Sequence, residues 1–255
     1  MRIKTARILD KTVVLIGTLA LAARTYQFPS QQFWDSLLQD RGWILIGLLL
    51  IVGFFAAFTP AEAISTRARA ERSLTIRRQI LNSFGRLLEI QLATTPQVGL
   101  DDLGLHVWRK RRTLRHPLSG VLARVATYRV GTNPVNRAFT PTKGVGVVGL
   151  CWKNDHEIAV DVEKIAIRAR SAVDFEHLRT SEGGDAVMNL EWVDFERIRH
   201  RGAVFAYPIR NARSKFVGCV SVDASVGFAA LDQPALRREM SLLSVVIGEA
   251  GFENV

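Results

Sequence analysis

Apolar residues in the first quarter of the chain are concentrated in two runs. Residues 42–61 carry no charge and are nearly continuous in apolar side chains. At about 1.5 Å of rise per residue, a helix of this length covers the roughly 30 Å hydrocarbon core of a bilayer. The first run, residues 12–23, is shorter and lies between Lys11 and Arg24. The pattern predicts a membrane span at 42–60, and a second at about 11–26 if the flanking charges reach the bilayer surface.

A cleaved signal peptide is the other interpretation of the first run, because a basic start, a short apolar stretch and the triplet Ala20-Leu21-Ala22 are typical of one. The closely following second run favours a transmembrane hairpin over residues 1–60. Basic residues precede the first run and follow the second, whereas the loop between them is balanced in charge. The positive-inside rule then places both ends, and the bulk of the chain, on the cytoplasmic side of the cell inner membrane.

Helical periodicity follows Pro60. Leu74, Leu81 and Leu88 recur every seven residues, with Phe84 between the last two. This spacing predicts an amphipathic helix from about 61 to 93, within a linking segment 61–97.

A second apolar stripe predicts a terminal helix over 234–250, with Pro234 in its first turn. Its members are Leu236, Met240, Leu243 and Ile247. We expect this stripe and the stripe on the helix 61–93 to hold a homodimer or a higher oligomer together.

Alternation of apolar and polar residues, or short apolar runs, predicts strands in the remaining half of the chain. These segments are 105–109, 123–130, 144–152, 158–161, 204–209 and 216–223. Helical spacing between 162 and 201 predicts short helices at 163–166, 172–175 and 188–199.

Gly144, Gly146 and Gly149 form a G-x-G-x-x-G pattern. In nucleotide-binding proteins this pattern opens a helix directly after a strand, with an acidic residue about 20 positions later. Here the glycines fall within or just before a predicted strand, which the turn-like residues 152–155 end. We interpret them as strand geometry and not as a phosphate-binding loop.

These segments together resemble the GAF domain family. A glycine-punctuated strand, the strand 158–161 ending in Asp161, a later strand with Pro208 near its end, and the strand 216–223 ending in Asp223 follow in that family's order. The resemblance implies an α+β domain over residues 98–255, with a predominantly antiparallel sheet of five or six strands. It also implies that the helices 61–93 and 234–250 share one face, and that a variable lid covers a ligand pocket on the other.

The function that the resemblance implies is sensory and not enzymatic. A membrane-anchored sensor or effector would bind a small ligand or a partner, and relay the binding to the membrane hairpin through the helix 61–93. The expected ligand-binding residues are Val148, Phe205 and Tyr207 from the sheet, Trp192 and Phe195 from the lid, and the polar Arg168, His156 and Asp161. The aromatic members would equally suit an ordinary core. The sequence names no cofactor.

Two functions of other classes remain open, a thiol-dependent redox enzyme and a purely structural membrane scaffold. Cys151 and Cys219 both fall in predicted strands, and the GAF relatives that reduce free methionine sulfoxide use several cysteines. Two cysteines without a histidine at ligand spacing predict neither a disulfide framework nor a metal site. No G-x-S-x-G, H-E-x-x-H, Walker or C-x-x-C motif is present.

Positive charge is concentrated in the first half of the chain. The net charge is +10, and residues 1–130 carry 19 Lys and Arg against 8 Asp and Glu. The densest cluster is Arg109, Lys110, Arg111 and Arg112. It predicts contact with anionic lipid at a membrane surface, at about 1 kcal/mol per charge. Nucleic acid ranks lower because only Trp108 accompanies the cluster, and a solvated edge strand remains a further interpretation.

Overall fold

The computed structural model describes residues 3–38, 43–94, 99–114, 116–131, 140–225 and 227–254. The chain divides into two compact units, Met1–Ala70 and Glu71–Val255. The second unit includes the last turns of the helix that ends at Leu92, because these turns pack into its core.

The first unit contains α1 (Ile3–Thr25), α2 (Gln31–Leu38) and the beginning of α3 (Trp43–Leu92). Within the described residues, no helix combines the length and the apolar character that crossing a membrane requires. In α1, Lys4, Arg7, Asp10 and Lys11 interrupt the apolar sequence. The structure does not describe residues 39–42 or most side chains of residues 44–64. Most of the predicted span 42–60 lies within these ranges. The predicted transmembrane hairpin is therefore not confirmed.

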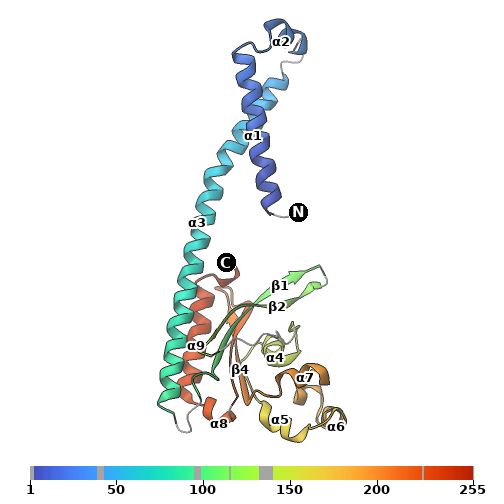
Figure 1. Ribbon diagram of the computed structural model, residues 1–255, viewed down its shortest axis with the longest axis vertical. Helices are drawn as coiled ribbons and strands as arrows, with labels where there is room; N and C mark the ends of the chain where they lie inside the picture. Colours follow the sequence, from blue (N-terminus) through green and yellow to red (C-terminus); the bar gives the residue numbers. More distant parts are fainter. Residues whose placement is uncertain are drawn as a thin grey trace. The chain divides into compact units, whose positions relative to one another are not determined.

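A five-stranded sheet forms the centre of the second unit (Figure 1). Its order is β2-β1-β5-β4-β3, and every neighbouring pair is antiparallel. The strands are β1 (Gly104–Thr113), β2 (His116–Arg129), β3 (Ile158–Asp161), β4 (Ala203–Arg210) and β5 (Phe216–Ala224). The α+β class and the antiparallel sheet are thus confirmed.

The end of α3 and α9 (Pro234–Glu249) cover one face of the sheet, with the short α8 (Phe228–Leu231) and η2 (Phe252–Asn254) beside them (Figure 1). The predicted stripe of α9 packs entirely into this core. On α3, Phe84 is buried, Leu88 is partly buried, and Leu74 and Leu81 are 55% and 52% exposed. Most of the apolar surface expected to join two copies is therefore used within one chain.

Five short helices cover the opposite face. They are α4 (Gly146–Asn154), α5 (Val162–Arg168), α6 (Ala172–Glu182), η1 (Gly184–Val187) and α7 (Trp192–Ile198). This second core includes Trp108, Cys151, Trp152, Phe175, Phe195 and Cys219.

The prediction of a strand at 144–152 is wrong, because this segment is a turn followed by α4. Gly144 and Gly146 have φ of +88° and +71°, which favour glycine, and a Cβ on Gly149 would meet the carbonyl oxygen of Thr142. A short apolar run does not distinguish a buried helix from a buried strand. The glycines therefore do open a helix, although the described residues directly before them, 140–143, are not a strand.

Candidate functional site

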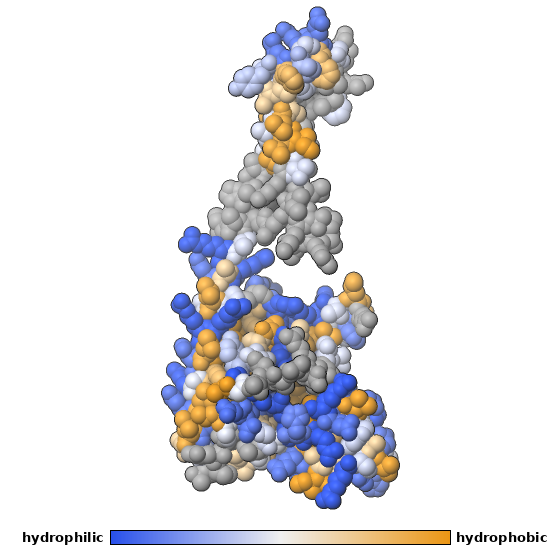
Figure 2. All heavy atoms as spheres, viewed as in Figure 1, coloured by the Kyte–Doolittle hydropathy of each residue, from blue (hydrophilic) through white to orange (hydrophobic). Residues whose placement is uncertain are grey.

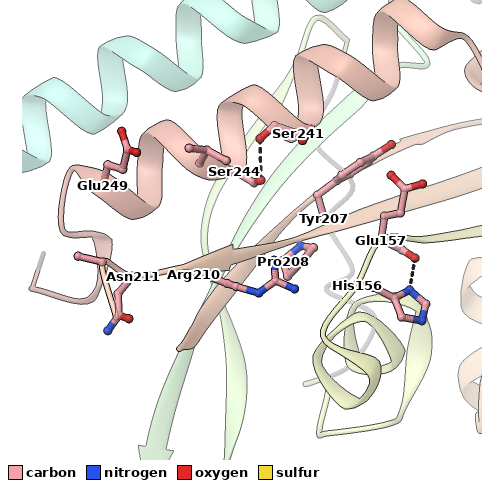
Figure 3. A pocket seen from close by; sticks show the side chains of 11 residues that line it. His156, Glu157, Tyr207, Pro208, Arg210, Asn211, Ser241, Ser244 and Glu249 are labelled. Atoms are coloured by element: carbon pink, nitrogen blue, oxygen red, sulfur yellow. Dashed lines mark hydrogen bonds between the residues drawn. The ribbon is translucent and has the colours of Figure 1, made fainter. Parts of the chain in front are cut away.

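A groove of about 530 Å³ opens beside the second half of β4 (Figure 3). It forms because β3 is short: β3 pairs only with residues 203–206 of β4, so the described part of β3 does not cover the residues from Tyr207 onward. The loop before β3 and the polar side of α9 supply the other walls. The lining residues are His156, Glu157, Tyr207, Pro208, Arg210, Asn211, Ala212, Ser241, Ser244, Val245 and Glu249.

Tyr207 is the most unusual residue of the groove. It is 3% exposed, and its hydroxyl has no hydrogen-bond partner among the described residues. Burial raises the pKa of its phenol, and the charge of Glu157 raises it further. A buried hydroxyl without a partner costs about 1–3 kcal/mol. The Glu157 carboxylate lies beside the phenol and contributes to this raised pKa, but it makes no hydrogen bond of normal geometry to the hydroxyl, which can therefore bind a ligand or a water molecule.

Most charges at the groove are already compensated. The Arg210 Nε donates to both carboxylate oxygens of Asp155 at 3.2 Å. The Arg237 Nη1 donates to the Glu157 Oε1 at 2.8 Å. Glu249, in contrast, has no ion pair or hydrogen bond among the described residues. The uncompensated charge of the groove is therefore negative.

Other polar groups of the groove retain hydrogen-bonding capacity. The His156 Nδ1 lies 2.6 Å from the carbonyl oxygen of Glu157, which requires Nδ1 to carry the proton and leaves Nε2 as an acceptor. The Ser244 hydroxyl donates to the carbonyl oxygen of Ser241 at 2.8 Å, and the Ser241 hydroxyl is exposed (Figure 3). The groove thus presents both donors and acceptors to a polar ligand.

Only two of the eight predicted ligand-binding residues, His156 and Tyr207, line this groove. Phe205 lies on the same face of β4 but is fully buried, with its ring centroid 5.0 Å from that of Phe228. Arg168 is paired with Glu182, and the Asp161 carboxylate accepts from the backbone N–H of Lys164 at 2.9 Å, which caps α5. These two polar residues therefore have structural partners of their own.

The remaining three predicted residues, Val148, Trp192 and Phe195, lie on the opposite face of the sheet. Phe195 is fully buried, and its ring centroid is 5.0 Å from that of Phe175 and 6.0 Å from that of Trp192. The side chains of β4 alternate between the two faces, so Phe205 and Tyr207 point away from these three residues. In the described part of the chain, the two groups of predicted wall residues therefore belong to separate cores on opposite faces of the sheet.

Sequence reasoning missed the contribution of α9 to the groove. Ser241, Ser244, Val245 and Glu249 recur at spacings of one to four residues beside the apolar stripe of this helix. Such a stripe of polar residues at the border of a buried face was the available signal.

A second group of buried polar residues lies on the face that α4 to α7 cover. Asp223, 7% exposed, accepts from Arg129 at 2.9 Å and pairs with Arg201 at 3.0 Å. The His106 Nε2 is 3.3 Å from the same carboxylate, and the His106 Nδ1 is 3.1 Å from the Thr127 hydroxyl. Among the described residues, the Arg129 Nε has no partner.

The charges around Asp223 determine its protonation. Burial by itself would raise the pKa of this carboxyl. The hydrogen bond from His106 and the charges of Arg201 and Arg129 outweigh burial and hold the pKa below its usual value. The Asp223 cluster is therefore a set of closely paired charges that joins β1, β2, β5 and the residues before β4.

Neither cysteine has the properties of a reactive thiol. Cys151 and Cys219 are both fully buried. Burial, with a contribution from neighbouring Cys151, raises the pKa of the Cys219 thiol well above its usual value. Because the thiolate is the reactive form, this arrangement does not favour thiol chemistry. Over the described ranges, no three His, Cys, Asp or Glu residues come together in a way that could hold a metal ion.

No family model matches the chain, and no curated protein matches it. Among solved structures, it is similar to the GAF domain region of a membrane protein from Geobacter sulfurreducens, with 15% identity, a TM-score of 0.41, and coverage of 71% of this chain and 95% of the other. A GAF sensor protein from Burkholderia vietnamiensis gives 14% identity, a TM-score of 0.39, and coverage of 74% and 97%. A type II free methionine-R-sulfoxide reductase from Thermoplasma acidophilum gives 10% identity, a TM-score of 0.38, and coverage of 69% of this chain and 95% of the other. At these identities the similarities assign no function to this chain.

Proposed function

We propose that residues 71–254 form a non-enzymatic, sensory ligand-binding domain and that the groove beside Tyr207 takes its ligand. The observation that carries this proposal is a buried hydroxyl without a partner among the described residues, in the wall of a groove of about 530 Å³. Ligand sites of small molecules commonly measure about 300–1,000 Å³ and place a few polar groups among packed walls. The proposed ligand is a small polar molecule that hydrogen-bonds Tyr207.

The charges of the groove narrow the ligand class. Arg210 and Glu157 are neutralised by Asp155 and Arg237, whereas Glu249 is unpaired among the described residues. A ligand with an ammonium or similar cationic donor would complement Glu249. Its acceptor atoms would meet the Tyr207 hydroxyl. Amino acids, and amines that also carry a hydroxyl or carbonyl group, have this combination.

Ligand binding would act on α9, which lies between the groove and α3. Ser241, Ser244 and Glu249 face the groove, and the apolar stripe of α9 packs into the core that α3 shares. The Arg86 Nη1 is 3.6 Å from the Glu239 Oε2, and the Gln91 Nε2 donates to the Ala230 carbonyl at 3.4 Å. If α9 can occupy two positions, a ligand that binds one of them more tightly shifts α9 toward that position. Through these contacts, α3 would move with it.

Three further parts of this proposal rest on the sequence. They are the membrane hairpin that would receive the signal, the cytoplasmic side of the inner membrane as location, and a homodimer. For the dimer, Leu74 and Leu81 on α3 and Leu242 on α9 are 55%, 52% and 48% exposed. Replacing Leu81 with Glu would dissociate such a dimer, because burying a carboxylate in an apolar contact is costly. Light scattering of the full chain measures this, and an unchanged mass would contradict the interface.

Two other functions are less well supported. A redox enzyme would need a reactive thiol, and both cysteines are buried. A structural scaffold would need no ligand, so this function gives no reason for a buried Tyr207 hydroxyl without a partner among the described residues. The scaffold would gain support if a broad set of metabolites left the thermal stability unchanged.

The test is a thermal-shift screen of amines, amino acids and related polar metabolites against the full chain. It is combined with mass spectrometry of small molecules that copurify with it. We expect at least one ligand whose affinity falls about tenfold or more in Tyr207→Phe and in Glu249→Gln, since each variant removes one polar contact. The control variants are Tyr128→Phe and Glu253→Gln, which do not line the groove. A ligand that binds equally to wild type and both groove variants would place its site elsewhere.

A further inference from the structure

The hairpin formed by β1 and β2 extends beyond the rest of the sheet (Figure 1). β5 pairs with β1 only as far as Arg109, which faces Gly218. From Lys110 to Leu122 the two strands pair with each other alone, in the part of the sheet that the structure describes. We call these residues, 110–122, the hairpin arm.

Two leucines are fully exposed at the end of the hairpin arm. Leu114 is 102% exposed and Leu118 is 92% exposed. Figure 2 shows hydrophobic surface projecting at this place. Both leucines lie at the projecting end of the hairpin, and neither belongs to the described cores of the chain.

Positive charge surrounds these leucines. Lys110, Arg111 and Arg112 are exposed, and because successive strand residues point to opposite faces, both faces of the hairpin arm are basic. The sequence contains no acidic residue between Asp102 and Asp155. The Lys110 ammonium lies 5.0 Å from the centroid of the Trp152 ring, which holds this side of the arm against α4. The cations of the hairpin arm therefore have no carboxylate of their own segment to neutralise them.

We propose that the hairpin arm docks on the surface of an anionic lipid bilayer. Leu114 and Leu118 enter the boundary between head groups and acyl chains. Lys110, Arg111 and Arg112 bind the anionic groups of the surrounding lipids. Apolar side chains combined with a basic face are the two components of interfacial membrane binding.

Three other occupants of this surface fit less well. Nucleic acid would match the charges but would leave both leucines in water, and Trp108, the neighbouring aromatic residue, is only 7% exposed. A second copy of the hairpin arm would bring like charges together. A solvated edge strand explains Lys and Arg, but not two fully exposed leucines.

The test measures binding of the purified full chain to vesicles of phosphatidylcholine alone and of phosphatidylcholine with one quarter phosphatidylserine. We expect stronger binding to the anionic vesicles, lost as salt is raised. Changing Lys110, Arg111 and Arg112 together to Gln should weaken anionic binding by roughly 100-fold. Other basic segments of the chain, such as residues 67–78, would also favour the anionic vesicles, so the loss of binding in the Gln variant, and not the difference between the vesicles, reports on the hairpin arm.

A second variant tests the leucines. Changing Leu114 and Leu118 to Asp should also reduce binding to anionic vesicles, and a polarity-sensitive fluorophore on Leu118→Cys should shift to the blue only when these vesicles are added. The matched controls are Arg213→Gln and Val173→Asp, of which Val173 is 78% exposed on α6. Both should bind as wild type does.

Four results would overturn the proposal. If the chain binds both vesicles equally, or if the Gln variant binds as wild type does, the hairpin arm is a solvated sheet edge and not a membrane contact. Affinity for duplex DNA or RNA that falls in the Gln variant, without loss of vesicle binding, would assign the surface to nucleic acid. A lower mass of the Asp variant in light scattering, with vesicle binding retained, would assign it to a second copy. Groove ligands play no part in these measurements, so their outcome is independent of the proposed function.

Discussion

The Asp223 cluster, centred on β5, and the groove at Tyr207 on β4 both hold buried polar groups, but on opposite faces of the sheet. Asp223 accepts or pairs with three cationic or imidazole groups at 2.9–3.3 Å. Tyr207 is similarly buried, yet its hydroxyl has no partner among the described residues. Buried polar groups are normally satisfied within the protein. The Asp223 carboxylate is satisfied within the fold, although the Arg129 Nε beside it has no partner among the described residues, whereas the Tyr207 hydroxyl lies in the wall of a groove that another molecule can enter.

The largest expected effect is the loss of charge in the Asp223 cluster. Asp223→Asn leaves two buried guanidinium groups without their carboxylate, and we expect a loss of about 3–5 kcal/mol in the free energy of unfolding. Urea unfolding followed by circular dichroism measures it. Asp194→Asn removes an exposed pair with Arg197 and should change stability by less than about 0.5 kcal/mol. Similar losses in the two variants would show that burial does not matter at Asp223.

Acid should weaken the same cluster. The pKa of Asp223 is lowered in the folded protein, so its contribution to stability is present above the unfolded pKa of about 3.9 and is lost as pH falls through the folded value. The stability difference between wild type and Asp223→Asn should therefore be largest near neutral pH and shrink below about pH 4. Urea unfolding at a series of pH values tests this, and a difference that grows on acidification would contradict the pairing.

A glycine makes room for the cluster. A Cβ on Gly104 would lie 2.6 Å from the Arg129 Nη2 and would also overlap the Asp223 Oδ1. Gly104→Ala should therefore destabilise the protein by about 1–3 kcal/mol. Gly85→Ala in α3 is the control with the opposite sign, because its Cβ meets nothing within 4 Å and Ala is the better helix former by about 0.5–1 kcal/mol. Equal effects of the two variants would contradict this packing.

The smallest effect should come from the groove. Tyr207→Phe removes a buried hydroxyl that has no partner among the described residues, so unfolding free energy should stay unchanged or rise by up to about 1 kcal/mol. Thermal unfolding without ligand checks this. A loss of more than 1 kcal/mol would mean that the hydroxyl is satisfied inside the folded chain, and the contrast with Asp223 would disappear.

The sequence by itself determined the strands and the terminal helix with useful accuracy. Alternation located parts of β1 and β2, short apolar runs located β3, β4 and β5, and the stripe from Leu236 to Ile247 located α9. The α+β class and the antiparallel sheet were expected from the resemblance to the GAF family, whereas the order of the strands came only from the structure. Cys219 lies in a strand as predicted, whereas Cys151 lies in α4.

Only the tertiary structure decided the environment of each apolar run and each polar group. The helix Gly146–Asn154 was predicted as a strand because residues 146–152 are buried and apolar, which leaves no periodicity that distinguishes a helix from a strand. Val148 and Tyr207 looked like walls of one pocket, but the sheet separates them. Whether a buried group such as Tyr207 or Asp223 has a hydrogen-bond partner depends on residues far away in the chain. The local sequence does not show which of those residues the fold brings near it.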